Sequence, residues 1–174
     1  MVEESDIDKA LDAYGKAYEL LWEQVQANPE QFPGCALTSG TIAEYFAKKY
    51  LEEKYTDCSV VFGRSTEKAW DIKVCDTNGG DILFQVKSTT RYSKNRSLSQ
   101  LVKGFDQLIV ITLDYDFFPL QVFLFEDASV FFGENKLTSL TVPCVDYKLR
   151  KGSKIFSQAK NIHEEFFENL ASKL

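Results

Sequence analysis

Four polar side chains stand where they could hold a metal ion and a phosphate together. Asp71, Gln85 and Lys87 lie in two β-rich runs separated by the turn sequence Asn78-Gly79-Gly80, and Glu44 lies in an amphipathic stretch upstream. Carboxylates that converge beside a lysine suit a hard cation such as Mg²⁺, which binds oxygen ligands and keeps several waters. Lys87 would then bind phosphate or orient one of those waters.

These side chains can form one site only if the strands and the helix that carry them direct them to the same place. Alternation places Gln85 and Lys87 on one face of their strand. Asp71 faces the same side as Gln85 if an odd number of residues lies outside the ladder, as a bulged turn at Gly79-Gly80 would allow. Glu44 lies about 110° from the centre of its helix's apolar face, at about 100° per residue. We therefore expect its carboxylate at the rim of the core.

These residues resemble the PD-(D/E)xK nuclease superfamily of restriction-endonuclease-like folds. The matching pieces, within residues 39–125, are Gly40-Thr41-Ile42-Ala43-Glu44, Trp70-Asp71-Ile72 and Gln85-Val86-Lys87. The resemblance implies an endonuclease of restriction, repair or defence type that hydrolyses DNA phosphodiester bonds with Mg²⁺, or Mn²⁺ as a substitute. It makes Asp71 and Gln85 metal ligands, adds Glu44 and the Val86 carbonyl as further ligands, and lets Lys87 activate or position water.

Two departures from that family pattern keep a second interpretation open. No proline precedes Asp71, and Gln85 replaces the usual acidic residue. The amide oxygen of Gln85 can still bind a metal, but the lost charge weakens affinity. The alternative function is a catalytically inactive DNA-binding or assembly module with the same fold. Asp71 would then be a strand-end residue, Lys87 a lysine at the sheet edge and Glu44 a solvated helix residue.

Charge is unevenly distributed along the chain. The net charge is −6, yet residues 87–103 contain no acidic residue. We expect this basic run to contact DNA phosphates, and a solvated face is the alternative. A second basic run extends from Lys148 through Arg150 and Lys151 to Lys160. The candidate nucleic-acid contacts are Lys87, Arg91, Lys94, Arg96 and Lys103.

The first 30 residues predict one long helix with a single apolar stripe. The stripe residues alternate in steps of four and three, which is coiled-coil spacing. The sequence favours docking of this helix on its own domain, and pairing with a second copy or a partner subunit through the terminal helices is the alternative. The stripe consists of Ile7, Leu11, Tyr14, Tyr18, Leu21 and Val25.

The remaining periodicity predicts an α/β fold in a single domain of residues 1–174. A helix capped by Ser39 runs to about Lys54, a short helix covers residues 97–105, and a final helix lies within residues 155–173 from about Ser157. Strands are expected at residues 59–62, 69–75, 81–88, 107–113 and 120–125. This order predicts a central mixed β-sheet of about five strands, with helices on both faces, as a restriction-endonuclease-like core.

Composition excludes several other classes of protein. The chain has 174 residues, of which 44% are hydrophobic, and no apolar run approaches the length of about 20 residues that a membrane span needs. One histidine and four dispersed cysteines, Cys35, Cys58, Cys75 and Cys144, cannot form a zinc site. We expect reduced cysteines, a cytoplasmic protein without a signal peptide, and a packing role for His163.

Overall fold

The computed structural model describes residues 6–34, 36–64, 67, 69–76, 79–93, 96–98, 101–132, 140–143 and 152–171. Several positions singled out above lie outside these residues: Cys35, Asn78, Lys94, Cys144, Lys148, Arg150 and Lys151. The helices are α1 (Asp6–Ala27), α2 (Ser39–Lys54) and α3 (His163–Ala171), with 3₁₀ helices η1 (Ala128–Phe131) and η2 (Lys154–Gln158). The strands are β1 (Ser59–Phe62), β2 (Ile72–Cys75), β3 (Ile82–Thr90), β4 (Ser97–Leu98), β5 (Gln107–Leu113), β6 (Pro119–Phe125), β7 (Leu140–Thr141) and β8 (Lys160–Asn161).

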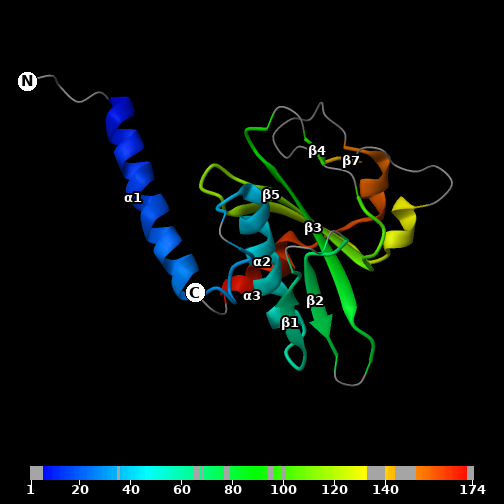
Figure 1. Cartoon of the computed structure of the whole chain (residues 1–174). Helices are drawn as coiled ribbons and strands as arrows, with labels where there is room; N and C mark the ends of the chain where they lie inside the picture. Colours follow the sequence, from blue (N-terminus) through cyan, green and yellow to red (C-terminus); the bar gives the residue numbers. More distant parts are fainter. Residues whose placement is uncertain are drawn as a thin grey trace, which may run out of the picture.

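A mixed six-stranded sheet forms the centre of the fold, in the order β1-β2-β3-β5-β6-β8 (Figure 1). The β3–β5 pair is parallel, and every other neighbouring pair in this sheet is antiparallel. The predicted α/β class with a mixed sheet is therefore confirmed. All residues from Leu108 to Leu113 of β5 are buried, as expected for a continuously apolar strand between two packed faces.

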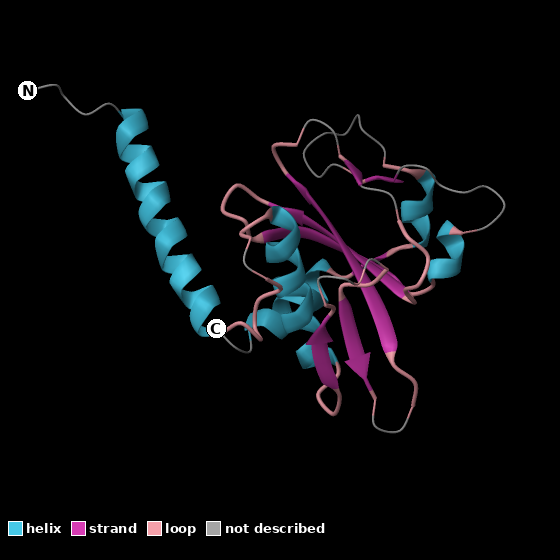
Figure 2. Ribbon diagram, in the orientation of Figure 1, coloured by secondary structure: helices cyan, strands magenta, loops and turns pink. Residues whose placement is uncertain are grey.

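The two faces of the sheet are covered differently (Figure 2). One face packs against α2 and α3 around Ala47, Ile109 and Phe166. The other face packs against η1, η2 and the β4–β7 pair, through a cluster that includes Phe125 and Phe131. The prediction of helices on both faces is therefore right only if the short 3₁₀ helices are counted, because both α-helices of the sheet region lie on one side.

Local interactions set the start of α2 and its position on the sheet. The N-cap is Thr38, one residue before the predicted Ser39; its hydroxyl accepts the Thr41 N–H at 3.2 Å, and the Thr41 hydroxyl accepts the Thr38 N–H in return. Further along, Tyr50 stacks on Phe166 at 5.0 Å between ring centroids and donates to Glu165 at 2.6 Å. These contacts join α2 to α3 and hold the helix that carries Glu44.

Two predicted helices are corrected by the structure. In the segment predicted as a helix over residues 97–105, β4 pairs with β7, and Gly104 has a φ of 131° that no right-handed helix allows. The final helix begins at His163, because Lys160–Asn161 forms β8 on the free edge of β6 and the Asn161 side chain accepts the His163 N–H at 3.2 Å. Local periodicity did not reveal either pairing.

The N-terminal helix α1 leaves the body of the molecule (Figure 1). Of its residues, Val25 alone is buried. The prediction that the stripe docks on its own domain is therefore wrong over the described helix. Among the described residues, no helix combines the length and apolarity needed to cross a membrane.

The Thr38 cap gives a test of how strongly α2 is anchored. Replacing Thr38 by Ala removes the acceptor for an orphan helix N–H and should lower the free energy of unfolding by about 1 kcal/mol. Urea unfolding followed by circular dichroism measures the change. Thr56→Ala, at an exposed turn position after α2, is the matched control and should leave the midpoint unchanged; equal midpoints for both variants would contradict the role of the cap.

Candidate active site

Asp71 lies where β2 separates from β3. Ile72 is the ladder partner of Phe84, and the N–H of the preceding Asp71 also donates to the Phe84 carbonyl, at 2.8 Å. Two residues of one strand thus oppose one residue of the other, which is a β-bulge. Beyond it, the Asp71 carboxylate accepts the Val86 N–H at 2.7 Å. The Asp71 side chain therefore accepts a β3 N–H that a backbone carbonyl of β2 would accept in a regular ladder.

This hydrogen bond places the Asp71 carboxylate close to the plane of the sheet, because a strand's N–H groups point along that plane. Val74 pairs with Ile82, so an odd number of residues separates these ladder partners, as the sequence required. At the other end of this ladder, Asp71 and Gln85 are the residues that follow the Ile72–Phe84 pair.

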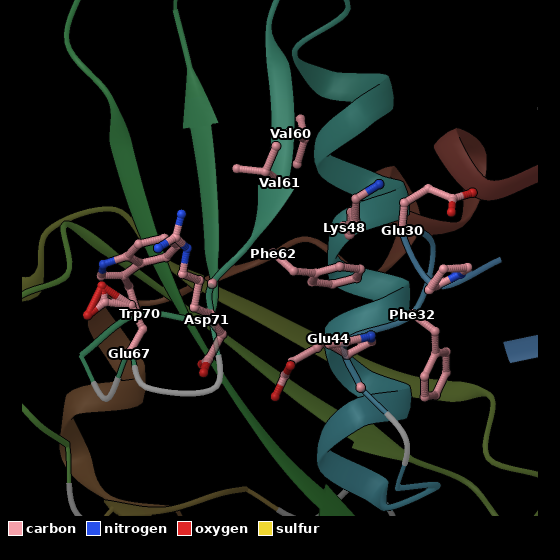
Figure 3. A pocket seen from close by; sticks show the side chains of 15 residues that line it. Glu30, Phe32, Glu44, Lys48, Val60, Val61, Phe62, Glu67, Trp70 and Asp71 are labelled. Carbon is pink, nitrogen blue, oxygen red and sulfur yellow. The ribbon is translucent and has the colours of Figure 1, made fainter. Parts of the chain in front are cut away.

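Glu44 reaches this gap from α2. Figure 3 shows the carboxylates of Glu44 and Asp71 directed toward the same space. Burial and, to a lesser extent, the nearby Asp71 charge raise the pKa of Glu44 to about 8, although Lys87 acts in the opposite direction. At neutral pH and without a cation, Glu44 therefore carries a proton in most molecules.

Asp71 and Lys87 complete the charged part of the site. Burial raises the pKa of Asp71, while the Val86 N–H and the Lys87 charge lower it. Lys87, on β3, therefore interacts electrostatically with the carboxyl groups of both Glu44 and Asp71. The structure brings together three of the predicted site residues, Glu44, Asp71 and Lys87.

Gln85 is the fourth predicted site residue, and its surroundings bear on a metal ion. Its side chain is only 2% exposed, and its Oε1 has no hydrogen-bond partner in the described part of the chain. A buried oxygen without a partner is an acceptor that a cation or water would satisfy. Among the described residues, no three His, Cys, Asp or Glu side chains lie together so that they could hold a metal ion. A metal at this site would therefore need Gln85 or a backbone carbonyl beside Glu44 and Asp71, and these oxygen donors fit Mg²⁺.

A cleft of about 650 Å³ opens beside the two carboxyl groups. Glu44 and Asp71 lie on its wall together with Phe62, Trp70 and Lys48 (Figure 3). Sequence reasoning missed Lys48, although its position one helical turn after Glu44 was a usable signal. Its ammonium group pairs with Glu52 and lies 5.4 Å from the centroid of the Phe62 ring. The cleft is large enough to admit part of a substrate next to the carboxyl groups.

The predicted basic surface is only partly exposed. Arg96 is 7% exposed and donates to the Pro143 carbonyl, so it is a structural residue and not a surface phosphate contact. A single guanidinium nitrogen of Arg91, Nη1, donates to both carboxylate oxygens of Asp114 at 3.1 Å. Lys103 is exposed, and Lys94 lies outside the described residues. His163, for which a packing role is predicted, contacts the Phe167 ring at 4.7 Å.

No protein-family model matches this sequence, and no curated protein matches it. Solved structures do match, among them a bacterial homing endonuclease with 19% sequence identity and a TM-score of 0.46. That match covers 77% of this chain and 94% of the other. At this level, similarity assigns neither a family nor a residue role to the chain.

The raised pKa of Glu44 predicts a pH-dependent stability. Between its ordinary value of 4.5 and about 8, Glu44 is protonated when folded and ionised when unfolded, so its contribution to stability is lost as the pH rises through that window. The Glu44→Gln variant has no carboxyl group to titrate at this position, so its free energy of unfolding does not fall in this way. The variant should gain about 1–2 kcal/mol over the wild type between pH 5 and pH 8.5, after discounting for solvent screening.

Urea unfolding at the two pH values measures this gain. Glu30→Gln, an exposed carboxyl that lines the same cleft, is the control and should show no pH-dependent difference. A constant offset between Glu44→Gln and the wild type at both pH values would show that Glu44 is ionised throughout.

Proposed function

We propose that the chain is a metal-dependent nuclease that hydrolyses phosphodiester bonds in DNA. The observation that supports it best is the convergence of Glu44, Asp71 and Lys87 at a gap in the sheet, beside a cleft. Two carboxyl groups and a lysine held together in a desolvated place are the groups that phosphoryl chemistry uses. A structural ion pair would not require the two acids to approach each other and raise the pKa of one of them.

In this proposal, Glu44, Asp71 and the Gln85 amide oxygen hold Mg²⁺ or Mn²⁺, with the Val86 carbonyl as a further ligand. The bound ion would neutralise charge on the phosphate and lower the pKa of a water molecule. Asp71 is kept in place by the Val86 N–H. Glu44 would release its proton on binding the cation. Lys87 positions the attacking water or stabilises the charge that develops on the phosphate oxygens.

The contacts to DNA follow from the same placement. Lys103 is exposed and Lys87 is half-buried at the site. Arg91 would reach phosphate from its pairing with Asp114. We propose these three cations as phosphate contacts, with Lys94 as a further candidate, whereas the buried Arg96 donates to the Arg91 and Pro143 carbonyls. A DNA-binding module without catalysis is the second candidate, and the neutral Gln85 at the metal position favours it.

Metal binding should depend on Asp71 and on pH. Asp71→Asn keeps an acceptor for the Val86 N–H but removes the charge, and should weaken Mn²⁺ binding by about 10–100-fold or more. Wild-type affinity should rise from pH 6.5 to pH 9, because the cation competes with the Glu44 proton. Isothermal titration calorimetry in two buffers of different ionisation enthalpy measures both the affinity and the released proton.

Two variants serve as controls for this titration. Asp57→Asn, at an exposed turn outside the site, should bind like the wild type, and Glu44→Gln should bind without releasing a proton. Equal affinity in Asp71→Asn and the wild type would remove Asp71 from the metal site.

Cleavage separates the nuclease from the binding module. Plasmid, linear and single-stranded DNA should be cut with Mg²⁺ and left intact with EDTA. Lys87→Ala should slow cleavage by about 100-fold or more, because a cation positioned at a phosphoryl group contributes several kcal/mol. Lys73→Ala removes the same charge from neighbouring β2, where Lys73 pairs with Asp81 at 3.0 Å, and should retain activity. DNA binding without cleavage of any substrate would favour the second candidate.

A further inference from the structure

The apolar stripe of α1 is exposed along most of its length. Ile7 is 72% exposed, and Leu11 and Tyr14 are each 63% exposed. Farther along the stripe, Tyr18 and Leu21 are still 42% and 41% exposed. An extended apolar surface of this kind on a single helix marks an interaction site. The stripe has coiled-coil spacing, so the surface that fits it is another helix.

We propose that α1 binds α1 of a second copy of this chain, and that the two helices run antiparallel. This inference does not rest on the proposed nuclease function. The stripe is symmetric about Lys16: Ile7 and Val25, Leu11 and Leu21, and Tyr14 and Tyr18 lie at equal distances on either side of it. An antiparallel pair centred there sets Leu11 against Leu21 and Tyr14 against Tyr18 of the other copy, and it brings Ile7 next to Val25, which is already buried in its own copy. The same patch on both copies forms a closed two-fold interface.

The residues beside the stripe are compatible with this pairing. Asp8, Gly15 and Trp22 flank the stripe on one side, and Ala10, Ala17 and Gln24 flank it on the other. In an antiparallel pair each of these rows faces the same row of the second copy, so Gly15 meets Gly15 and Ala17 meets Ala17 near the centre. Small side chains there allow the helices to approach closely. Asp8 is the one charged residue of the two rows, and the register places it near Trp22 of the other copy, so the flanks bring no like charges together.

Apart from Asp8 at the flank of the stripe, the charged residues of α1 lie on its other side. Lys16 pairs with Asp12 at 2.7 Å, and Lys9 pairs with Asp6 at 3.6 Å, within the same helix. These pairs satisfy the polar face without a partner. The apolar face alone is left for the second copy.

The surroundings at the C-terminal end of α1 favour the antiparallel direction over the parallel one. A pocket of about 500 Å³ begins at Leu21 and Val25 and continues over Phe46 of α2 and Phe118. Phe118 is 49% exposed. In an antiparallel pair, Ile7 of the second copy lies beside Val25 at the mouth of this pocket. A parallel pair brings no N-terminal apolar residue there and also aligns the two helix dipoles unfavourably.

The oligomeric state of the full chain tests the pairing. Sedimentation equilibrium and light scattering should give the mass of two chains for the wild type. Leu11→Asp inserts a charge into two layers of the interface and should reduce the mass to that of one chain. Lys16→Asp places the same residue on the polar face and should stay dimeric, with helix content checked by circular dichroism. A wild-type mass of one chain, or of more than two, would overturn the two-helix pair.

Cross-linking tests the direction. Oxidation of the Leu11→Cys/Leu21→Cys variant should give covalent dimers, because the antiparallel register places position 11 beside position 21 of the other copy and both positions are exposed. Leu11→Cys alone should give none beyond the wild-type background, which accounts for the native cysteines. Efficient cross-linking of Leu11→Cys alone would establish a parallel pair and overturn the proposal.

Discussion

The candidate site depends on one hydrogen bond, from the Val86 N–H to the Asp71 carboxylate at 2.7 Å. It forms because β2 turns away from β3 at the bulge and leaves a strand N–H without a backbone partner. An unpaired buried N–H is costly, so the carboxylate that satisfies it is strongly positioned. Asp71 is thereby kept at an opening in the sheet instead of on one of its packed faces.

The electrostatics of the site follow from that position. A carboxyl group in a half-buried opening is poorly solvated, and a second one from α2 meets both desolvation and a neighbouring negative charge. The pKa of Glu44 rises to about 8 as a result, and Lys87 offsets only part of this rise. The two acids remain close because α2 is attached to the sheet by Ala43 and Ala47 and to α3 by Tyr50. A cation would relieve the same conflict by replacing the proton.

The same chain carries a polar opening on its body and an apolar stripe on α1. The stripe residues other than Val25 do not pack into the core of the body, since only Val25 of α1 is buried. A helix of this kind gains little stability alone, because most helical stability in proteins comes from packing of an apolar face. The stripe and the site are therefore formed by different residues.

The sequence by itself determined the elements whose patterns are local. The bounds of α2, β1 and β5 follow from helical spacing, from short β-rich runs and from continuous apolarity. The odd number of residues between the last ladder partners of β2 and β3 follows from the position of the turn. Tertiary structure decided the rest: the bulge at Asp71, the burial of Arg96, the pairing of β4 with β7 and the exposure of α1. Each of these depends on contacts between residues far apart in the chain. Periodicity records which face of an element is apolar, but it does not record what that face meets.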